Sequence, residues 1–398
     1  MATSTRLLHH AYRPPAEFEA PAPGVHKAST VFFPNVAAMR ARDWKDKSAY
    51  TYGLHGTPTT FTLEARIATL EGGTHCVLAP SGLSALALVD MAFLRAGDEV
   101  LLPDNAYGPG LSLAEVELAR WGIAHRRYDP MRPQHLAELI GPATRLVWLE
   151  AAGSVTLEFP DIPALVAVVQ AANAARAQCD PGARTIVSAL DNTWGAGVAF
   201  APFALGVDVS LQALTKYPSG GGDVLMGSVV TRDAGLHRQL LLTHMRLGLG
   251  VGANDAELVL RGLSSIALRY HAQDRATRAL AGWMRQQAVV AQVFHPALPG
   301  SPGHAHWLRD ASAAACLFSV VFQPHITPAQ VDAFCDRLRL FRLGYSWAGP
   351  VSLCVPYDLS AMRTLPGPHP AALVRFAVGL EDVADLQADL AQALAGLS

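Results

Sequence analysis

From residue 57 onward, short apolar runs alternate with longer stretches in which alanine and leucine recur at helical spacing. Parallel strands that helices cover on both faces show such continuous apolar runs instead of strict alternation. The runs that we interpret as strands span residues 76–78, 100–102, 146–149, 185–190, 207–211 and 224–230. The sequence therefore predicts an α/β fold whose mostly parallel sheet carries helices on both faces.

The two ends of the chain depart from this alternation. Residues 1–56 are rich in proline, alanine and aromatic residues without a sustained period, so we expect an N-terminal arm that reaches a neighbouring subunit. Residues 57–258 should form a large, cofactor-binding domain, and residues 259–398 a smaller C-terminal α/β domain. A long helical pattern that runs from Asn254 toward Trp283 is expected to bridge the two.

The composition limits the kinds of molecule that the protein can be expected to bind. The chain has 398 residues, of which 51% are apolar and 16% charged, as is typical of a compact, oligomeric globule. A formal net charge of -2 and a pI of about 6.7 give no basis for binding nucleic acid or an anionic membrane surface. Mean hydropathy is +0.21, yet charged residues, proline or glycine interrupt every long apolar stretch. We therefore expect no membrane span and a small-molecule partner.

Cysteine and histidine usage excludes two further classes of site. The five cysteines are scattered, odd in number and without a CxxC pair, which predicts reduced thiols in the cytoplasm. The histidines, including His304 and His306, lack both a helical metal-ligand spacing and a carboxylate companion. No metal site is expected.

A carboxylate and a lysine follow two of the expected strands. Asp191 comes directly after the run 185–190, at the carboxyl end where open α/β sheets place their ligands, and Lys216 follows the run 207–211. A carboxylate there can keep a pyridine nitrogen protonated while a lysine forms a Schiff base, so the pair predicts a pyridoxal 5'-phosphate site. Taken singly, each has a plainer interpretation, Asp191 as a helix cap and Lys216 as a surface charge.

Two segments are candidates for holding the phosphate. Gly82 and Leu83 open a predicted helix, and the free amides and positive dipole end of such an N-terminus bind anions. A Ser-Gly pair before a helix is more often only a cap, so this signal depends on the pair Asp191 and Lys216. Thr215 lies beside that lysine, and we interpret its hydroxyl as a second phosphate contact.

Two further residues carry a functional and a structural interpretation. Tyr107 follows the run 100–102 at the same edge of the sheet, where it would stack on the cofactor ring unless it is an ordinary loop tyrosine. Arg375 lies inside the apolar run 374–378, where an unpaired charge is costly. It should bind the α-carboxylate of an amino acid substrate in a bidentate manner, or else pair with an internal Asp or Glu.

Several short motifs occur together from about residue 45 to the end of the chain. They are Tyr52-Gly53, Glu71-Gly72-Gly73, Ser81-Gly82, Ala106-Tyr107, Asp191-Asn192-Thr193-Trp194, Thr215-Lys216-Tyr217, Tyr345-Ser346-Trp347, Arg375 and Gly379-Leu380-Glu381-Asp382. This set resembles the Cys/Met-metabolism family of pyridoxal phosphate enzymes. The resemblance implies fold type I, similar to aspartate aminotransferase, and a homotetramer built as a dimer of dimers. It also implies that Tyr52 completes the active site of the adjacent subunit.

The resemblance further implies a carbon-sulfur lyase. Lys216, Tyr107 and Tyr52 would be catalytic, while Ser346 and Trp347 would bind substrate with Arg375. Tryptophan after Ser346 favours members that act at the β-carbon, since γ-acting relatives usually have leucine there. The expected reaction is the α,β-elimination of L-cystathionine to homocysteine, pyruvate and ammonia. A broader cysteine-S-conjugate lyase or desulfhydrase, a γ-acting member and a non-catalytic homologue stay open as alternatives.

The chain departs from the family pattern at a few positions. Leu54 stands two residues after Tyr52, where the family usually has an arginine that binds phosphate across the dimer interface. Ala348 replaces a usual glycine, Val351 replaces a common glutamate, and residues 219–223 lack a histidine that many relatives have. Leu54 should affect how tightly the cofactor is retained. Ala348 and Val351 should affect which leaving group the enzyme prefers.

Overall fold

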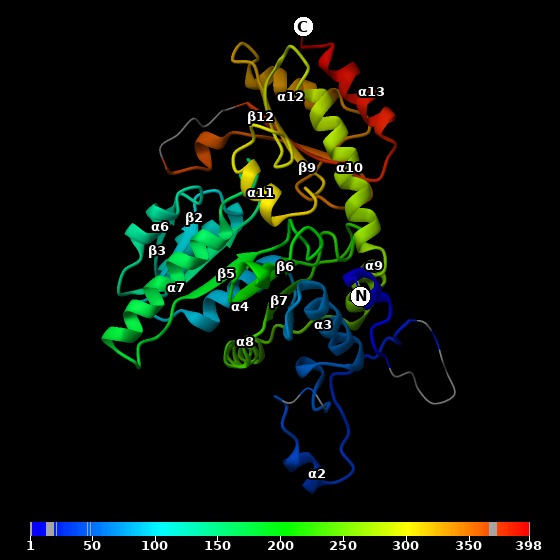
Figure 1. Ribbon diagram of the computed structural model, residues 1–398. Coiled ribbons are helices and arrows are strands. Elements are labelled where there is room, and N and C mark those ends of the chain that lie inside the picture. Colours follow the sequence, from blue (N-terminus) through cyan, green and yellow to red (C-terminus); the bar gives the residue numbers. More distant parts are fainter. Residues whose placement is uncertain are drawn as a thin grey trace.

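The computed structural model of the chain describes residues 2–12, 20, 22–45, 47, 49–365 and 372–397. Two sheets organise it, one of seven strands and one of five strands. In Figure 1 the five-stranded sheet lies above the seven-stranded sheet, and the long helix α10 (Ile266–Met284) runs beside both. The candidate active site lies where the two sheets face each other.

The seven-stranded sheet confirms the expected α/β fold. Its order is β1-β7-β6-β5-β4-β2-β3, and only β7 runs antiparallel to its neighbours. The strands are β1 (His75–Ala79), β2 (Glu99–Pro103), β3 (Ala124–Tyr128), β4 (Thr144–Glu150), β5 (Val187–Asp191), β6 (Val209–Ala213) and β7 (Gly227–Thr231). All six expected strands are present, so the mostly parallel sheet is confirmed. The edge strand β3 was not expected.

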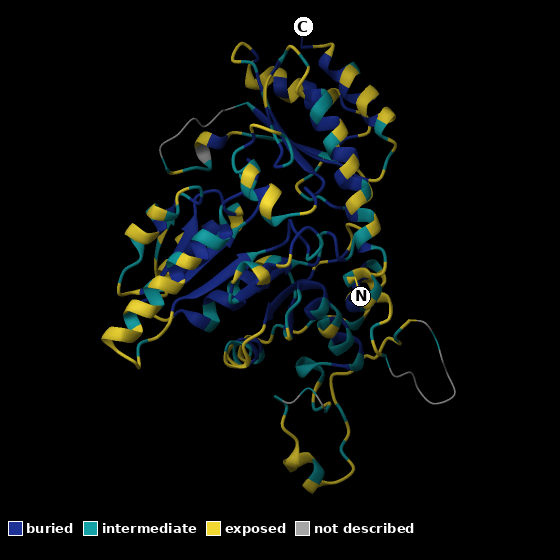
Figure 2. Cartoon of the chain, viewed as in Figure 1, coloured by how far each residue is buried: buried dark blue, intermediate teal, exposed yellow. Residues whose placement is uncertain are grey.

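Helices cover both faces of this sheet, because central strands such as β4 carry apolar side chains on both faces. Along β4, Leu146 and Trp148 pack against α4 (Gly82–Phe93), while Val147 and Leu149 pack against α7 (Ile162–Cys179). Figure 2 shows the result, a buried sheet between helices whose outer faces are exposed. The other helical elements of this part are α3 (Pro58–Glu71), α5 (Gly108–Ser112) with a continuing π-helical turn (Leu113–Leu118), α6 (Pro133–Leu139), a short 3-10 turn (Pro202–Leu205) and α8 (Ala234–Leu247).

The second sheet has the order β10-β11-β12-β9-β8, and its pairs are antiparallel except for β10 with β11. Its strands are β8 (Val290–Phe294), β9 (Leu317–Phe322), β10 (Arg342–Leu343), β11 (Leu353–Tyr357) and β12 (Leu373–Ala377). Around it lie α11 (His304–Asp310), α12 (Pro328–Arg337), a 3-10 turn (Leu359–Ala361) and α13 (Val383–Leu394). On β12, Val374 and Phe376 join the core under these helices, which directs the intervening Arg375 to the opposite face.

The long helix expected between Asn254 and Trp283 is two helices. α9 (Ala253–Leu263) ends before Ser264, and α10 begins after Ser265. The Ser264 hydroxyl donates to the Arg261 carbonyl oxygen at 2.7 Å, and the Ser265 hydroxyl donates to the Gly262 carbonyl oxygen at 3.4 Å. Serine hydroxyls that satisfy helix carbonyls in this way compete with the helical hydrogen bonds and favour a break.

The N-terminal segment packs against α3 near the buried Leu7 and then extends away from the two sheets. It contains α1 (Thr3–Leu8), α2 (Val36–Ala41) and a 3-10 turn (Gly53–His55), and α2 projects furthest in Figure 1. Phe32 is 94% exposed, which is unusual for a large apolar side chain. Contact with a neighbouring subunit stays a prediction. No helix among the described residues is both long and apolar enough to cross a membrane.

Candidate active site

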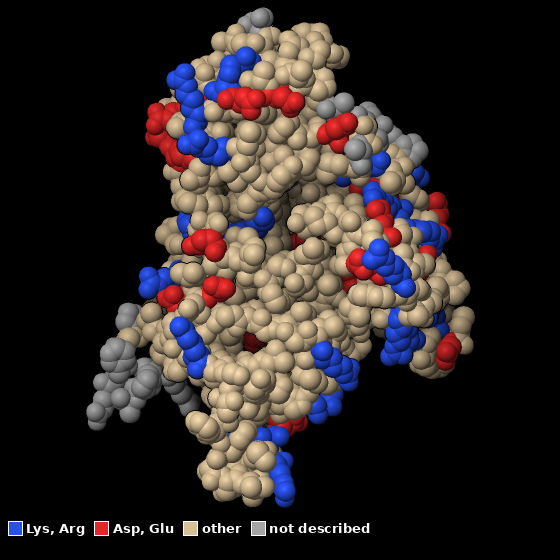
Figure 3. Space-filling model, turned by 180° about the vertical axis from the view of Figure 1, so that it is seen from behind, with Lys and Arg blue, Asp and Glu red and all other residues tan. Residues whose placement is uncertain are grey.

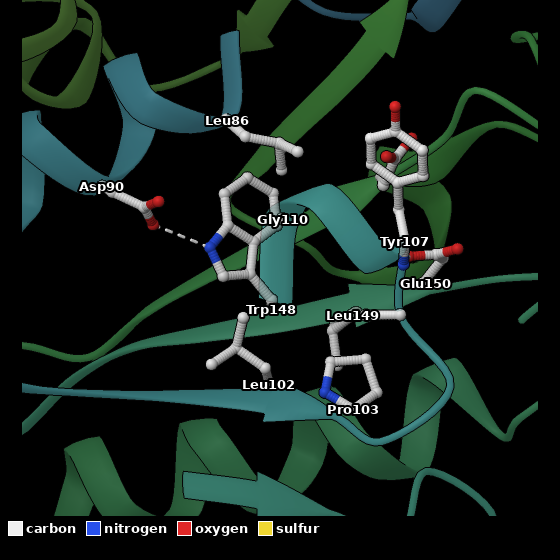
Figure 4. A pocket seen from close by; sticks show the side chains of 11 residues that line it. Leu86, Asp90, Leu102, Pro103, Tyr107, Gly110, Trp148, Leu149 and Glu150 are labelled. Atoms are coloured by element: carbon white, nitrogen blue, oxygen red, sulfur yellow. Dashed lines mark hydrogen bonds between the residues drawn. The ribbon is translucent and has the colours of Figure 1, made fainter. Parts of the chain in front are cut away.

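The carboxyl ends of β2, β4, β5 and β6 lie together under the second sheet. Seen from behind, the molecule has a hollow between its upper and lower parts, and blue and red charges are interspersed around it (Figure 3). Figure 4 shows a pocket at this edge, and Tyr107, Trp148, Glu150 and Asp191 are among its lining residues. The sequence therefore brings several polar side chains to one place in the fold.

Asp191 is the last residue of β5 and is held by Thr193. The Thr193 backbone N–H donates to Asp191 Oδ1 at 2.9 Å, and the Thr193 hydroxyl donates to the same oxygen at 2.5 Å. That hydroxyl also accepts the Ala213 N–H at 2.9 Å, which joins the ends of β5 and β6. Burial raises the pKa of the Asp191 carboxyl in spite of these bonds. A buried carboxylate of this kind is stabilised by a cationic partner, such as a protonated pyridine nitrogen.

Lys216 follows β6 and reaches toward the second sheet. Its Nζ donates to Ser346 Oγ at 2.9 Å and lies 5.4 Å from the centroid of the Trp347 ring. The structure thus brings the expected substrate-binding residues Ser346 and Trp347 to the expected lysine. Burial lowers the pKa of Lys216 to about 8, and the charge of Arg375 acts in the same direction. A neutral amine is therefore accessible near neutral pH, which suits a nucleophile or base.

The rate at which the apoprotein attaches the cofactor aldehyde should rise with pH, with a midpoint near 8. Only the neutral amine attacks an aldehyde. Because the pKa of Lys216 is lowered from an ordinary 10.5 to about 8, the amine loses its proton in a pH range that the measurement covers. The measurement is the absorbance of protein-bound cofactor after mixing at a series of pH values. Arg375→Met, which removes a neighbouring positive charge, should move the midpoint upward. A rate without pH dependence in this interval would contradict the assignment.

Arg375 lies on β12 and has no carboxylate partner in the part of the chain that the structure describes. Its Nη2 donates to the Tyr345 carbonyl oxygen at 3.3 Å, and its guanidinium carbon lies 5.4 Å from the Tyr357 ring centroid. Its Nε is buried without a hydrogen-bond partner, and no Asp or Glu among the described residues lies within ion-pair distance. The internal ion pair left open by the sequence is therefore not formed with the described residues, and a bound carboxylate would satisfy the group.

The expected phosphate-binding segment begins α4. The Ser84 N–H donates to the Ser81 hydroxyl at 3.0 Å, while the N–H groups of Gly82 and Leu83 belong to the first turn, which has no acceptor within a helix. A Cβ on Gly82 would lie 2.7 Å from the Cβ of Ala213, so only glycine lets this turn approach the end of β6. The Thr215 hydroxyl bonds both backbone groups of Met226 at 3.3 Å. Its role toward phosphate stays a prediction.

The two expected tyrosines lie in different places. Tyr107 precedes α5, and burial together with the charges of Asp191 and Glu150 raises the pKa of its phenol, which places it in the same electrostatic environment as the site. Tyr52 lies in the N-terminal segment, where its hydroxyl is 3.5 Å from the Ser29 hydroxyl and its ring meets His55 edge-on. This arrangement does not join Tyr52 to the other residues within one chain.

Sequence reasoning missed two residues of the site, Glu150 and Tyr357. Glu150 is the last residue of β4 and pairs in register with Asp191 on β5. The signal was available, because Glu150 directly follows the apolar run 146–149 just as Asp191 follows its own run. Tyr357 ends β11, and the sequence carries no comparable signal for it because its contact with Arg375 depends on strand register across β12.

Comparison with known proteins adds to this geometry. Residues 4–395 match the family described as Cys/Met metabolism PLP-dependent enzyme. The chain is 39% identical to cystathionine β-lyase of Bordetella avium over 92% of this chain and 90% of that protein. It is 35% identical to cystathionine β-lyase of Escherichia coli over 92% and 91%. A solved structure of cystathionine γ-synthase from Xanthomonas oryzae pv. oryzae, in complex with aminoacrylate and cysteine, superposes with a TM-score of 0.88 at 28% identity and covers 100% of this chain and 98% of that one.

Proposed function

This chain belongs to the Cys/Met-metabolism family of pyridoxal 5'-phosphate enzymes with fold type I, and we propose that it is a cystathionine β-lyase. It would cleave L-cystathionine to homocysteine, pyruvate and ammonia. The observation that carries this proposal is the position of the Lys216 amine, 2.9 Å from Ser346 Oγ and over the Trp347 ring. This contact supports the proposal, because Trp347 is the residue that by resemblance favours action at the β-carbon.

The residues of the site fit the cofactor. Lys216 would hold it covalently, Asp191 would keep its ring nitrogen protonated, and Tyr107 would stack on its ring. The amides of Gly82 and Leu83, the Thr215 hydroxyl and the partner subunit's Tyr52 would contact its phosphate. When bound, the cofactor supplies an electron sink that stabilises negative charge at the substrate Cα.

The protein's own groups account for the remaining steps. Arg375 binds the substrate α-carboxylate and fixes the orientation of Cα relative to Lys216. The freed Lys216 amine takes the Cα proton, the Cβ–S bond breaks, and the resulting ammonium can return its proton to the departing thiolate. The released enamine hydrolyses to pyruvate and ammonia. Ser346 orients the amine through its hydroxyl.

Identification of the product tests this function. Purified holoenzyme supplied with L-cystathionine should release pyruvate and homocysteine in equal amounts. Release of 2-oxobutyrate and cysteine would instead assign a γ-lyase, an activity for which the likeness to a γ-synthase structure gives a specific reason to look. Supplying L-cysteine alone measures the broader desulfhydrase activity through sulfide. A protein that binds cofactor and forms no keto acid from either substrate would be a non-catalytic homologue.

We also propose the assembly and organisation of the protein. Residues 1–56, which include the exposed Phe32, would reach a neighbouring subunit of a homotetramer built from two dimers, so that each site receives a Tyr52 from its partner. Residues 57–258 would form the cofactor-binding domain and residues 259–398 the small domain. The five cysteines are free, which fits a cytoplasmic enzyme.

Leu54→Arg should slow the loss of cofactor on dialysis without changing the elimination product. A charge-assisted hydrogen bond to phosphate contributes about 1.5 to 3 kcal/mol, so its absence weakens binding by roughly tenfold to a hundredfold. The neighbouring His55 is poorly suited to supply that charge, because burial lowers the pKa of its imidazole and its ring stacks on Trp44 at 4.8 Å. The measurement is the cofactor absorbance retained over time, with Leu54→Met as the uncharged control. Unchanged or faster loss in the arginine variant would show that the charge comes from elsewhere.

A further inference from the structure

Glu150 lies next to the proposed ring-binding carboxylate but contacts a different group. It is paired in register with Asp191 across β4 and β5, so the two side chains leave the sheet on the same face. Its Oε2 accepts the Tyr107 backbone N–H at 2.8 Å. In Figure 4, Glu150 and Tyr107 lie together at one end of the pocket, whereas Asp90 and Trp148 bond to each other at the other end. The mechanism above makes no use of Glu150.

The backbone around Tyr107 shows why this bond matters. Tyr107 is the N-cap position of α5, and no side-chain cap satisfies the first turn of this helix. The preceding residues are held independently, since the Ala106 N–H donates to the Pro103 carbonyl oxygen at 3.0 Å and the Ser154 N–H donates to the Asn105 carbonyl oxygen at 2.7 Å. The bond to Glu150 therefore fixes the peptide that sets the direction of the Tyr107 side chain.

We infer that Glu150 is a positioning residue, which orients Tyr107 against the cofactor ring by accepting its backbone N–H. This inference rests on the proposed function, because it assigns the ring contact to Tyr107. An uncharged carboxyl or amide oxygen at this position accepts an N–H as a carboxylate does. Burial and the neighbouring Asp191 raise the pKa of Glu150 well above its usual range, which agrees with an acceptor role that needs no negative charge.

Two substitutions distinguish the role of Glu150 as a hydrogen-bond acceptor from the role of its negative charge. Glu150→Gln keeps an acceptor oxygen and cannot ionise, whereas Glu150→Leu keeps the approximate size and removes the acceptor. The first measurement uses the apoprotein, in which hydrogen exchange at the Tyr107 amide should be about tenfold faster in the leucine variant and retain most of its protection in the glutamine variant. This readout does not depend on any enzymatic activity.

The second measurement uses the holoenzyme. Glu150→Leu should weaken the visible circular dichroism of the bound cofactor, and Glu150→Gln should restore most of that signal. When Tyr107 is also replaced by leucine, the further change Glu150→Leu should have little additional effect on the dichroism, because the two residues act as one unit. Glu99→Leu is the matched control, since it removes a carboxylate bonded to Arg126 at 2.6 and 2.8 Å at the far end of β2. It should lower the melting temperature while leaving the dichroism in place.

The results of these experiments can overturn the positioning role of Glu150 in two ways. Equal losses in the glutamine and leucine variants would overturn the acceptor role and assign the effect to the charge of Glu150. Normal dichroism and normal Tyr107 exchange in Glu150→Leu would overturn the inference altogether. If the leucine variant does not fold, Glu150→Asp provides the same comparison, because its shorter side chain withdraws the oxygen from Tyr107 and should accelerate exchange. Failure of the proposed function alone would leave the apoprotein result unchanged.

Discussion

Lys216→Ala should lower kcat for elimination by at least about a thousandfold, because the substitution removes both the proposed covalent attachment and the proposed base that takes the Cα proton. The fold should persist, since among the described residues the Lys216 side chain donates one hydrogen bond, to Ser346, and its Nζ lies over the Trp347 ring. The cofactor should still bind without a covalent link, through Asp191 and the first turn of α4. The measurements are pyruvate formation, cofactor content and far-ultraviolet circular dichroism.

Reduction with borohydride provides the matching chemical test. In the unmodified protein, peptide mapping should find the reduced cofactor on Lys216, and the alanine variant should carry none. Lys45→Ala is a suitable control, because Lys45 lies in the N-terminal segment, where its Nζ is 3.9 Å from Asp43, and among the described residues it does not contact Lys216 or Asp191. A label on another lysine, or elimination that survives in Lys216→Ala, would refute the assignment of the attachment site.

Arg375→Lys should lower kcat/KM by roughly tenfold or more while cofactor content stays normal, because lysine keeps the charge and loses the planar pair of donors that matches a carboxylate. Arg342→Lys, an exposed change on the neighbouring part of the same sheet, should have little effect. A loss confined to cofactor binding, with a normal KM, would show that Arg375 does not contact substrate.

The same arginine should lower the stability of the apoprotein. Arg375 is 7% exposed, and its buried Nε has no hydrogen-bond partner among the described residues, so its charge is poorly compensated in the absence of an anion. Arg375→Met should therefore raise the free energy of unfolding by about 1 kcal/mol or more, as replacement of poorly compensated buried charges often does. A lower melting temperature would indicate that Arg375 serves the fold instead.

Local sequence patterns were sufficient to predict the strands that are buried on both faces of the sheet. The strands that deliver Asp191 and Lys216 are buried and mainly apolar, so their positions followed largely from hydrophobicity. β3 was missed because His125, Arg126 and Arg127 give this edge strand a polar sequence, and its stability comes from pairing with β2 and from ion pairs such as Arg126 with Glu99. Edge strands with exposed charges carry little hydrophobic signal.

Contacts between particular pairs of residues within the site were harder to predict from the sequence. The bond between Glu150 and the Tyr107 amide joins residues 43 positions apart, and the contact between Arg375 and Tyr357 depends on the register of two antiparallel strands. Neither follows from periodicity. Tyr52 illustrates a different limit, because its expected contacts belong to another copy of the chain and depend on assembly as well as on folding.

The apolar core under the site continues from one sheet to the other. Leu214 and Tyr217, on either side of Lys216, belong to the same cluster as Ala313–Leu317 and Ala377, and the Cys316 N–H donates to the Tyr217 hydroxyl at 2.8 Å. The spacing between Lys216 and Arg375 is therefore set by dense packing, which resists gradual adjustment. Evolution of a new leaving-group preference should then proceed mainly through the loop 345–351, whose Tyr345 is 81% exposed, while the distance from the proposed base Lys216 to the proposed carboxylate anchor Arg375 is inherited unchanged.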